Sequence, residues 1–398
     1  MGMSYSSRMF WPLAALGALL VAVGLGAAHY MESRGHIVTG MGNEVVWGLP
    51  HVFAIFMIVA ASGVLNVASV GSVFGQAPYK ARARLAGLLS LALLAGGLMV
   101  LMLDLGRPDR VIVAATHYNF RSVFAWNVFL YSGMAGVVIV YLWTMFEPGL
   151  ARWTKPAGLA VLVWRFVLTT GTGSIFGFLV ARQAYQSAVL APLFIVLSLA
   201  WGMAVFVLAQ AALSVATGRR WPDEVRARMA RLLGIFVAAS LYFVAVQHMT
   251  NGYEARRGGF EAFLLLGRNG GMRYAFLFWG GFVLLGSLLP MLLVFHPRFG
   301  RERSVLAASA LVVLGAFAWL FAFIVAGQAF PLEIFPGAVV SSSFHDGMVA
   351  NYVPRLPELL LGLGGVGAAF LITTVGVHLF DMAPHDAAAA SASRLGGG

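Results

Sequence analysis

The chain has 398 residues, of which 60% are hydrophobic and 10% charged, and its mean hydropathy is +0.85. This composition excludes an ordinary soluble enzyme and predicts a polytopic membrane protein. The formal net charge is +11, but no soluble domain presents a basic face, so anionic lipid explains the charge better than nucleic acid does. The sequence contains no cysteine, which excludes cysteine-ligated iron–sulfur clusters, thioether-bound haem, disulfides and thiol catalysis within it.

Ten apolar runs are each long enough to cross a bilayer as a helix, which takes about 20 residues. They are 10–30, 45–74, 83–103, 120–146, 157–182, 188–217, 229–250, 272–296, 303–326 and 356–380. None has the alternating pattern of an outer-membrane barrel. The sequence therefore predicts an all-α integral membrane protein with about ten transmembrane helices, in one polytopic domain over residues 1–382.

The two ends of the chain differ in character. The first run follows Arg8 and lacks a small-residue cleavage site, so we expect a retained helix rather than a signal peptide. Residues 383–398 are rich in Ala, Ser and Gly and are predicted to form a flexible tail. Loops on the side of both termini carry more Lys and Arg than the opposite loops, which predicts cytoplasmic termini.

Charged residues gather between the third and fourth runs, where Asp104, Arg107, Asp109, Arg110 and Arg121 occur close together. Charge at the edge of a span is unfavourable unless it is paired or functional. This junction is therefore a candidate site. The alternative is structural: a solvated loop whose arginines anchor helix ends, with Asp104 and Arg107 ion-paired across the turn.

The predicted topology puts nearly every unusual polar residue at the outer leaflet. The outer loop 327–357 adds Glu333, His345 and Asp346 to this group. A quinone headgroup needs hydrogen-bonding partners for two oxygens and, for quinol oxidation, a nearby base such as histidine or a carboxylate. The residues predicted to line or support such a site are Glu44, His51, Asp104, Arg107, Asn119, Arg121 and His248.

The two histidines among these residues could also have other roles. His51 follows Pro50 about one to two turns into its span, where proline often marks irregular backbone, and it could be a packing residue, a quinone contact or a haem ligand. His248 has the same alternatives. A transmembrane haem pair needs four histidines at two depths, and the sequence offers no second deep pair, so haem is not expected.

Arg165 lies inside the fifth run and cannot easily reach either surface, so we expect it to face the bundle interior. The patch Thr169–Ser174 follows it. We consider a proton route through Arg165, Thr170, Thr172 and Ser174, and equally a structural pairing of Arg165 with backbone carbonyls. The patch lacks the Lys-Ser/Thr of a phosphate loop and sits in a span, so it does not predict nucleotide binding.

Three motifs resemble the NrfD/PsrC family of polysulfide reductase-type membrane subunits. They are Trp47-Gly48, Asp104-Leu105-Gly106-Arg107 and Asn119-Phe120-Arg121-Ser122-Val123-Phe124. Ten spans and long outer loops resemble the branch that contains HybB and DsrP, and the run 169–177 is most similar to DsrP.

The resemblance implies two four-helix bundles plus flanking helices in a bacterial inner membrane. It also implies a haem-free subunit that binds menaquinone or ubiquinone and docks a ferredoxin-type iron–sulfur subunit on its outer face, in a complex of sulfur metabolism. Several relatives place a His-Gln pair where this chain has Thr169–Ser174, so part of their quinone site does not carry over.

Two other classes remain as alternatives. A secondary transporter would use a midplane site on broken helices, often within inverted repeats. A b-type haem cytochrome subunit would show a haem absorption band.

Overall fold

The computed structural model describes residues 7–218, 221–296, 298, 299, 301–332, 347–380 and 382. The predicted tail 383–398 and the outer-loop residues Glu333, His345 and Asp346 lie outside this part of the chain. Within it, ten helices are long and apolar enough to cross a membrane, and no strand forms. They are α1 (Ser7–Arg34), α2 (Leu49–Ser72), α4 (Ala83–Leu103), α6 (Val123–Phe146), α7 (Thr154–Gly177), α8 (Leu190–Thr217), α9 (Asp223–Tyr253), the continuous helix α11–η6–α12 (Met272–Phe276, Leu277–Leu288 and Leu289–Phe295), α13 (Glu302–Ala329) and α14 (Leu356–Leu379). The prediction of an all-α membrane protein is confirmed, including the irregular run that forms α7.

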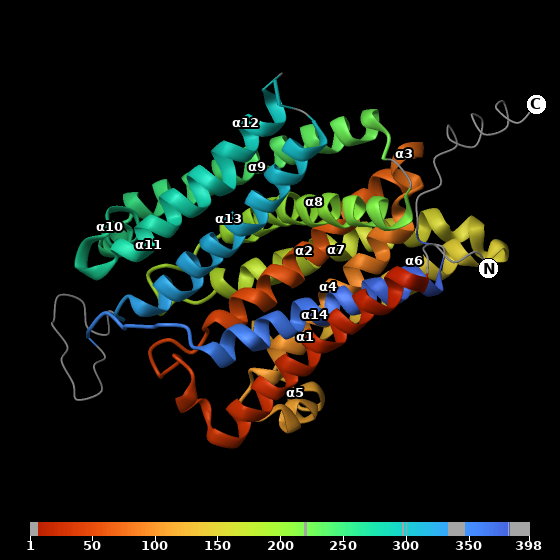
Figure 1. The fold of residues 1–398 in the computed structure, drawn as a ribbon. Helices are drawn as coiled ribbons and strands as arrows, with labels where there is room; N and C mark the ends of the chain where they lie inside the picture. Colours follow the sequence, from red (N-terminus) through yellow and green to blue (C-terminus); the bar gives the residue numbers. More distant parts are fainter. Residues whose placement is uncertain are drawn as a thin grey trace, which may run out of the picture.

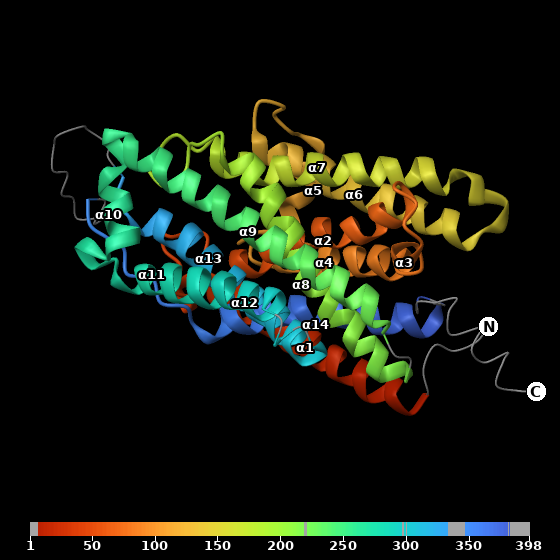
Figure 2. The same ribbon diagram turned by 90° about the horizontal axis from the view of Figure 1, so that it is seen from above.

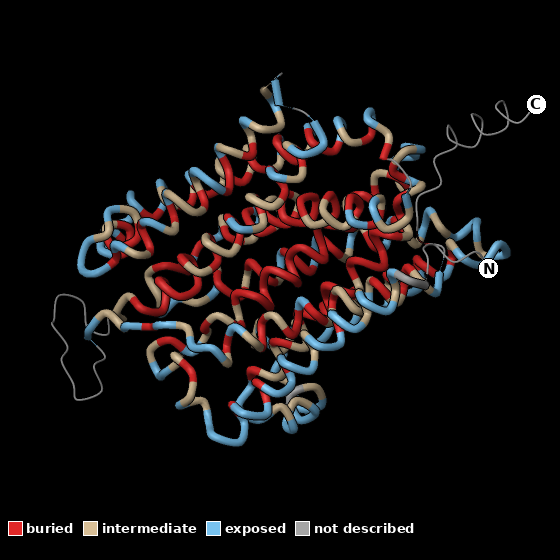
Figure 3. The backbone as a smooth tube through the Cα atoms, in the orientation of Figure 1, coloured by how far each residue is buried: buried red, intermediate tan, exposed pale blue. Residues whose placement is uncertain are grey.

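The helices pack as two four-helix bundles with a flanking pair (Figures 1 and 2). The first bundle contains α2, α4, α6 and α7, and the second contains α8, α9, α11–η6–α12 and α13. Helix α2 also packs on α8, which joins the bundles. Most of the buried residues therefore lie in the middle of the molecule, along α2, α4 and α8, as Figure 3 shows.

Small residues allow the central contact. A Cβ on Gly63 of α2 would lie 1.6 Å from the carbonyl oxygen of Ser198 in α8, and one on Gly202 would meet the backbone of Gly63. Only glycine lets these two backbones approach so closely, as is common where membrane helices cross.

The first and last spans form the flanking pair. Gly24 of α1 faces Gly364 of α14, and a Cβ on either would lie 2.5–2.6 Å from the other's Cα. Helix α14 in turn packs on α4 of the first bundle. The two ends of the transmembrane domain are thereby packed against each other.

Three short helices lie between the spans: α3 (Ala77–Lys80), α5 (Val111–Thr116) and α10 (Gly258–Leu266). Helix α5 packs on the start of α6, and α10 packs on α9 and α11. Within the second bundle, η6 is wound as a π-helix over Leu277–Leu288. Such winding is rare in proteins and usually much shorter.

Candidate functional site

The entry to α2 is tied to three other elements at one end of the molecule. The Gln328 side chain of α13 accepts hydrogen bonds from the backbone N–H groups of Val46 (3.0 Å) and Trp47 (2.9 Å). Arg182, between α7 and α8, donates to the carbonyls of Gln328 (2.6 Å) and Glu44 (3.1 Å). These bonds fix where α2 begins, and so fix its first turn.

His51 occupies that first turn. Irregular backbone is not found at Pro50, because α2 begins at Leu49 and Pro50 lies in its first turn, where a missing N–H leaves nothing unpaired. The His51 ring stacks on Trp47, with centroids 5.9 Å apart and planes at 25°. Its position is therefore fixed by helix start and aromatic contact together.

Asp104, the residue after α4, pairs with His51 rather than with Arg107. Nδ1 of His51 lies 2.8 Å from Oδ2 of Asp104, whose side chain is 1% exposed. The distance is that of an ion pair, but neither carboxylate oxygen makes a hydrogen bond of ordinary geometry with the described residues. A buried carboxylate without donors is unfavourable, and the His51 ring is the group placed to compensate it.

A cavity of about 480 Å³ opens beside His51, inside the first bundle. This volume is typical of small-molecule sites, which span about 300–1,000 Å³ and are mostly apolar with a few polar groups. The polar groups here are His51, Asn127, Tyr131 and Ser132, and the rest of the wall is largely apolar. The apolar lining includes Trp47, Ile55, Leu98, Leu101, Met102, Phe124, Ile175, Phe176 and Ile324.

Asn127 and Tyr131 are cavity residues that the sequence did not single out. Both come from α6, four residues apart and hence on one helix face. Oδ1 of Asn127 is buried and has no hydrogen-bond partner among the described residues. The available signal was the four-residue spacing of two polar side chains within an otherwise apolar run.

Four other predicted site residues lie outside this cavity. Arg107 makes a two-pronged ion pair with Asp109 (3.0 and 2.9 Å), and both side chains are exposed. This hydrogen bond raises the pKa of Arg107 and lowers that of Asp109. Asn119 accepts from the Arg121 backbone N–H (3.0 Å) in a local turn, and both residues are exposed. Glu44 lines two separate surface pockets instead.

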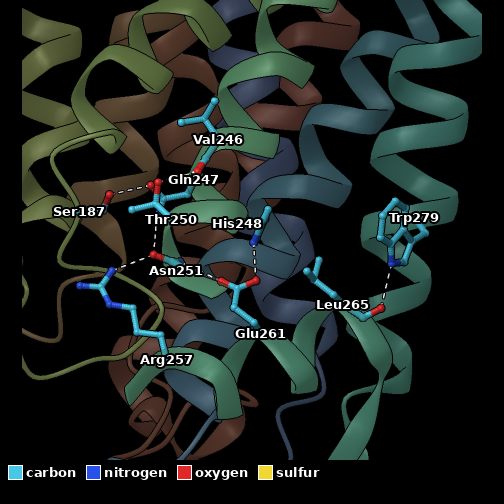
Figure 4. Close-up of polar contacts among 10 residues, drawn as sticks. All are labelled: Ser187, Val246, Gln247, His248, Thr250, Asn251, Arg257, Glu261, Leu265 and Trp279. Atoms are coloured by element: carbon cyan, nitrogen blue, oxygen red, sulfur yellow. Dashed lines mark hydrogen bonds and ion pairs between the residues drawn. The ribbon is translucent and has the colours of Figure 1, made fainter. Parts of the chain in front are cut away.

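His248 belongs to a second polar cluster, between α9, α10 and the α7–α8 connection (Figure 4). Its Nδ1 lies 2.8 Å from Oε2 of Glu261, whose other oxygen accepts from Asn251 (2.9 Å). Arg257 donates to Asn251 Oδ1 (2.8 Å) and to the carbonyls of Tyr185 and Gln186 (3.0 and 2.6 Å). The cluster continues through Gln247 to Ser187. The cavity of about 480 Å³ contains His51 but not His248, and a pocket shared by both histidines stays a prediction.

Arg165 is buried and faces α2, as expected. It donates to the Ser62 carbonyl (3.5 Å) and to Asn66 Oδ1 (3.3 Å). Of the residues predicted to continue a route, Thr172 is buried, Ser174 half-buried and Thr170 exposed. Arg165 therefore has the structural pairing that the sequence allowed, and the proton route stays a prediction.

Comparison with known proteins bears directly on this fold. The sequence matches the family described as Polysulphide reductase, NrfD over residues 37–332. The chain belongs to the NrfD family. The matched region contains His51, Asp104 and the whole first bundle.

Curated relatives align over most of their length. The chain is 30% identical to the Hdr-like menaquinol oxidoreductase integral membrane subunit of Archaeoglobus fulgidus, over 94% of each chain. It is 27% identical to a putative membrane subunit of dimethyl sulfoxide reductase from Halobacterium salinarum, over 92% of this chain and 90% of that one. It is 26% identical to protein NrfD of Escherichia coli, over 72% of this chain and 96% of that one. NrfD-family membership and ten apolar helices together indicate a multi-pass membrane protein.

Proposed function

We propose that this chain is the quinone-interacting membrane subunit of a multi-subunit redox complex, with the headgroup held in the cavity beside His51. The observation that carries the proposal is His51, paired with the buried Asp104, at the wall of a largely apolar cavity of about 480 Å³. A quinone combines two polar oxygens with an apolar ring and tail, which fits such a lining. The relative from Archaeoglobus fulgidus, by its name a menaquinol oxidoreductase subunit, adds support for this ligand class and for menaquinone within it.

The proposed site assigns a task to each polar group. Nε2 of His51 has no hydrogen-bond partner among the described residues, so it is available to accept a proton from a quinol hydroxyl. Asp104 orients the ring through Nδ1 and stabilises the imidazolium that results. Asn127 and Tyr131 are suited to hydrogen-bond the headgroup, and Trp47 packs against its plane. This set is narrower than the seven residues predicted from the sequence.

Electrons then pass to or from a partner subunit. The chain has no cysteine, and among the described residues no group of three or more His, Asp or Glu could hold a metal. We infer that the partner is an iron–sulfur subunit of ferredoxin type, docked on the face where α2 begins, in a complex that acts on sulfur compounds. Copurification tests the inference, and an intact complex without an iron–sulfur subunit would contradict it. A haem band in the spectrum of the purified chain would contradict the expectation that this chain is haem-free.

The proposed membrane is the bacterial inner membrane, with both termini in the cytoplasm. The support is the excess of Lys and Arg in the loops on that side. Reporter fusions at each terminus test it, because an active periplasmic reporter at either terminus contradicts the topology.

Binding of a fluorescent hydroxyquinoline N-oxide, a quinol analogue, tests the site. We expect His51→Ala and Asp104→Asn to weaken binding by about tenfold or more, equivalent to about 1.4 kcal/mol. The matched control is His248→Ala, which also removes a histidine paired with a carboxylate at 2.8 Å. Unchanged affinity in both site variants, or an equal loss in the control, would show that the headgroup does not bind in this cavity.

A further inference from the structure

A second apolar cavity, here called the inter-bundle groove, lies where the two bundles and the flanking pair meet. Its volume is about 240 Å³, and its walls come from α1, α4, α8 and α14. It lies at the end of the molecule where α1 begins and α14 ends, opposite the end that contains His51 (Figure 1). Its two ends are marked by Leu85 and Leu93 of α4, Ala209 and Ala216 of α8, and Val366 and Val377 of α14.

The groove runs along the helix axes from one end of the spans inward. Leu85, Ala216 and Val377 each lie within two residues of a helix end. The residues at the other end of the groove lie seven to eleven positions further along the same helices. At 1.5 Å per residue the groove is about 10–16 Å long. The hydrocarbon of one leaflet, half of a core of about 30 Å, has the same depth.

The groove opens sideways, between α8 and α14. Its floor is buried and includes Leu85 and Leu213, whereas Ala212 of α8 is exposed and Val366 of α14 is 39% exposed. Helix α8 packs on α2, α7, α9 and α13, and α14 packs on α1, α2 and α4, so the two helices belong to differently packed groups. Both are candidate membrane spans, so the opening faces lipid.

The groove is too narrow for another helix. A helix about 10 Å across would fill roughly 900 Å³ over a length of 12 Å. That is roughly four times the volume of the groove. A hydrocarbon chain is much thinner, and the leucine side chains of α4 offer it close dispersion contacts along the floor. The dimensions therefore favour one apolar chain that lies parallel to the helices.

A phospholipid fits this position better than a quinone does. The polar side chains among the lining residues are Thr373 and Thr374, and the Thr373 hydroxyl already donates to the Ala369 carbonyl (2.7 Å). A quinone headgroup needs partners for two oxygens, which the cavity beside His51 offers and this groove does not. A phospholipid headgroup would instead lie at the helix ends, near loops that carry the excess of Lys and Arg.

We propose that the inter-bundle groove binds an acyl chain of a membrane phospholipid, which joins the flanking pair to the second bundle. The lipid supplies apolar contacts to α8 on one side and to α14 on the other. This role goes beyond the proposed function and does not depend on it, because the groove and the cavity beside His51 share no lining residue.

Native mass spectrometry of the full chain, purified from membranes in a mild detergent, tests the groove directly because it detects retained lipids by mass. Ala212→Phe fills the groove from its rim. Thr373→Phe fills it from α14, which keeps the test independent of one variant's folding. The matched control is Val215→Phe, on α8 beside the groove, where the side chain is 77% exposed and does not line it.

We expect the wild-type chain and Val215→Phe to retain a phospholipid, and both groove variants to lose it. Phosphatidylglycerol added to the delipidated wild-type chain should raise its unfolding temperature in a saturable way, since a ligand that binds the folded state stabilises it. The apparent affinity for this lipid should fall about tenfold in both groove variants and remain unchanged in the control.

Retention of the lipid at the wild-type level in both groove variants would overturn the proposal, as would an equal loss in Val215→Phe. A wild-type chain that retains no phospholipid and gains no stability from phosphatidylglycerol would also overturn it. A retained mass that corresponds to a quinone would show that the groove holds a different ligand. Loss of analogue binding at His51 is a separate result, which bears on the proposed function alone.

Discussion

Two histidine–carboxylate pairs occupy the same end of the molecule, one in each bundle, and their surroundings differ. His51–Asp104 and His248–Glu261 have the same 2.8 Å separation between Nδ1 and a carboxylate oxygen. Glu261 has both oxygens engaged, whereas Asp104 has no hydrogen-bond donor of ordinary geometry among the described residues.

The difference shows that the hydrogen bonds of a buried carboxylate indicate whether its role is structural or ligand-responsive. A carboxylate whose hydrogen bonds are all made holds parts of a structure together, and changing its protonation breaks those contacts. A carboxylate left without donors beside a cavity can respond to a ligand. Sequence position and pair distance do not distinguish these cases, but the remaining hydrogen bonds do.

Turnover should separate the pairs by the widest margin. We expect His51→Ala to lower quinol oxidation by about 100-fold or more, because it removes the proposed base. We expect His248→Ala to retain activity within about threefold, measured in membranes at equal amounts of folded protein. Equal losses in both variants would mean that the pairs do not differ in function.

For stability we expect the opposite order, with the larger effect in the cluster that contains His248 and Glu261. Arg257→Met removes the donor to the carbonyls of Tyr185 and Gln186 and leaves Asn251 Oδ1 with the bond from Gln247 alone, so we expect a loss of about 3–5 kcal/mol in unfolding free energy. Unfolding in detergent, followed by circular dichroism, measures it. Analogue affinity of the folded protein should stay within about twofold. A variant as stable as wild type would show that the second cluster does not hold its helices together.

Asn127 offers a finer test, because binding and stability should move in opposite directions. Its Oδ1 is buried without a partner among the described residues, so Asn127→Leu should make the ligand-free chain slightly more stable, by about 1 kcal/mol. The same change should weaken analogue binding about threefold to tenfold. Ser132→Ala, at the same cavity but with its hydroxyl already bonded to the Val128 carbonyl, is the control. A loss of both stability and binding would indicate a packing role for Asn127.

The smallest effect is expected at the exposed turn. Arg107→Ala breaks only the pair with Asp109, which is solvated on both sides, so analogue affinity should change by less than about twofold. Because Arg107 lowers the pKa of Asp109, the pair persists as pH falls until that lowered pKa is reached. A tenfold loss of analogue affinity at pH 7 would indicate that Arg107 is part of the binding site.

The sequence predicted the fold well because membrane spans depend on length and apolar composition, which can be read directly. It also singled out His51 and Asp104 individually, and their role in a quinone site stays a prediction. It could not pair them, because the ion pair considered for Asp104 was the local alternative with Arg107, three residues away, and not one with a residue on another helix. The chain turns after Asp104, so the carboxylate is buried while Arg107 is exposed.

Two further features could not be predicted from the sequence, for physical reasons. Glu261 lies on α10, which is too short to be a span, so nothing linked it to His248 before folding brought them together. Asn127 and Tyr131 are polar positions in an apolar run, and whether they face lipid or a cavity depends on how α6 is rotated in its bundle.

The packing of the last span beside the first has a consequence for biogenesis. Synthesis and insertion proceed from the N-terminus, so α2 enters the membrane long before Gln328, Tyr352 and Glu358 are made. Gln328 and Tyr352 accept hydrogen bonds from N–H groups at the start of α2, and Glu358 accepts one from the Tyr352 hydroxyl. These late residues therefore fix where the first turn of α2 begins. A ribosome that stops before α13 would leave a chain that contains His51 but lacks the residues that fix its position. Quality-control proteases would then encounter the redox site only in an incomplete form.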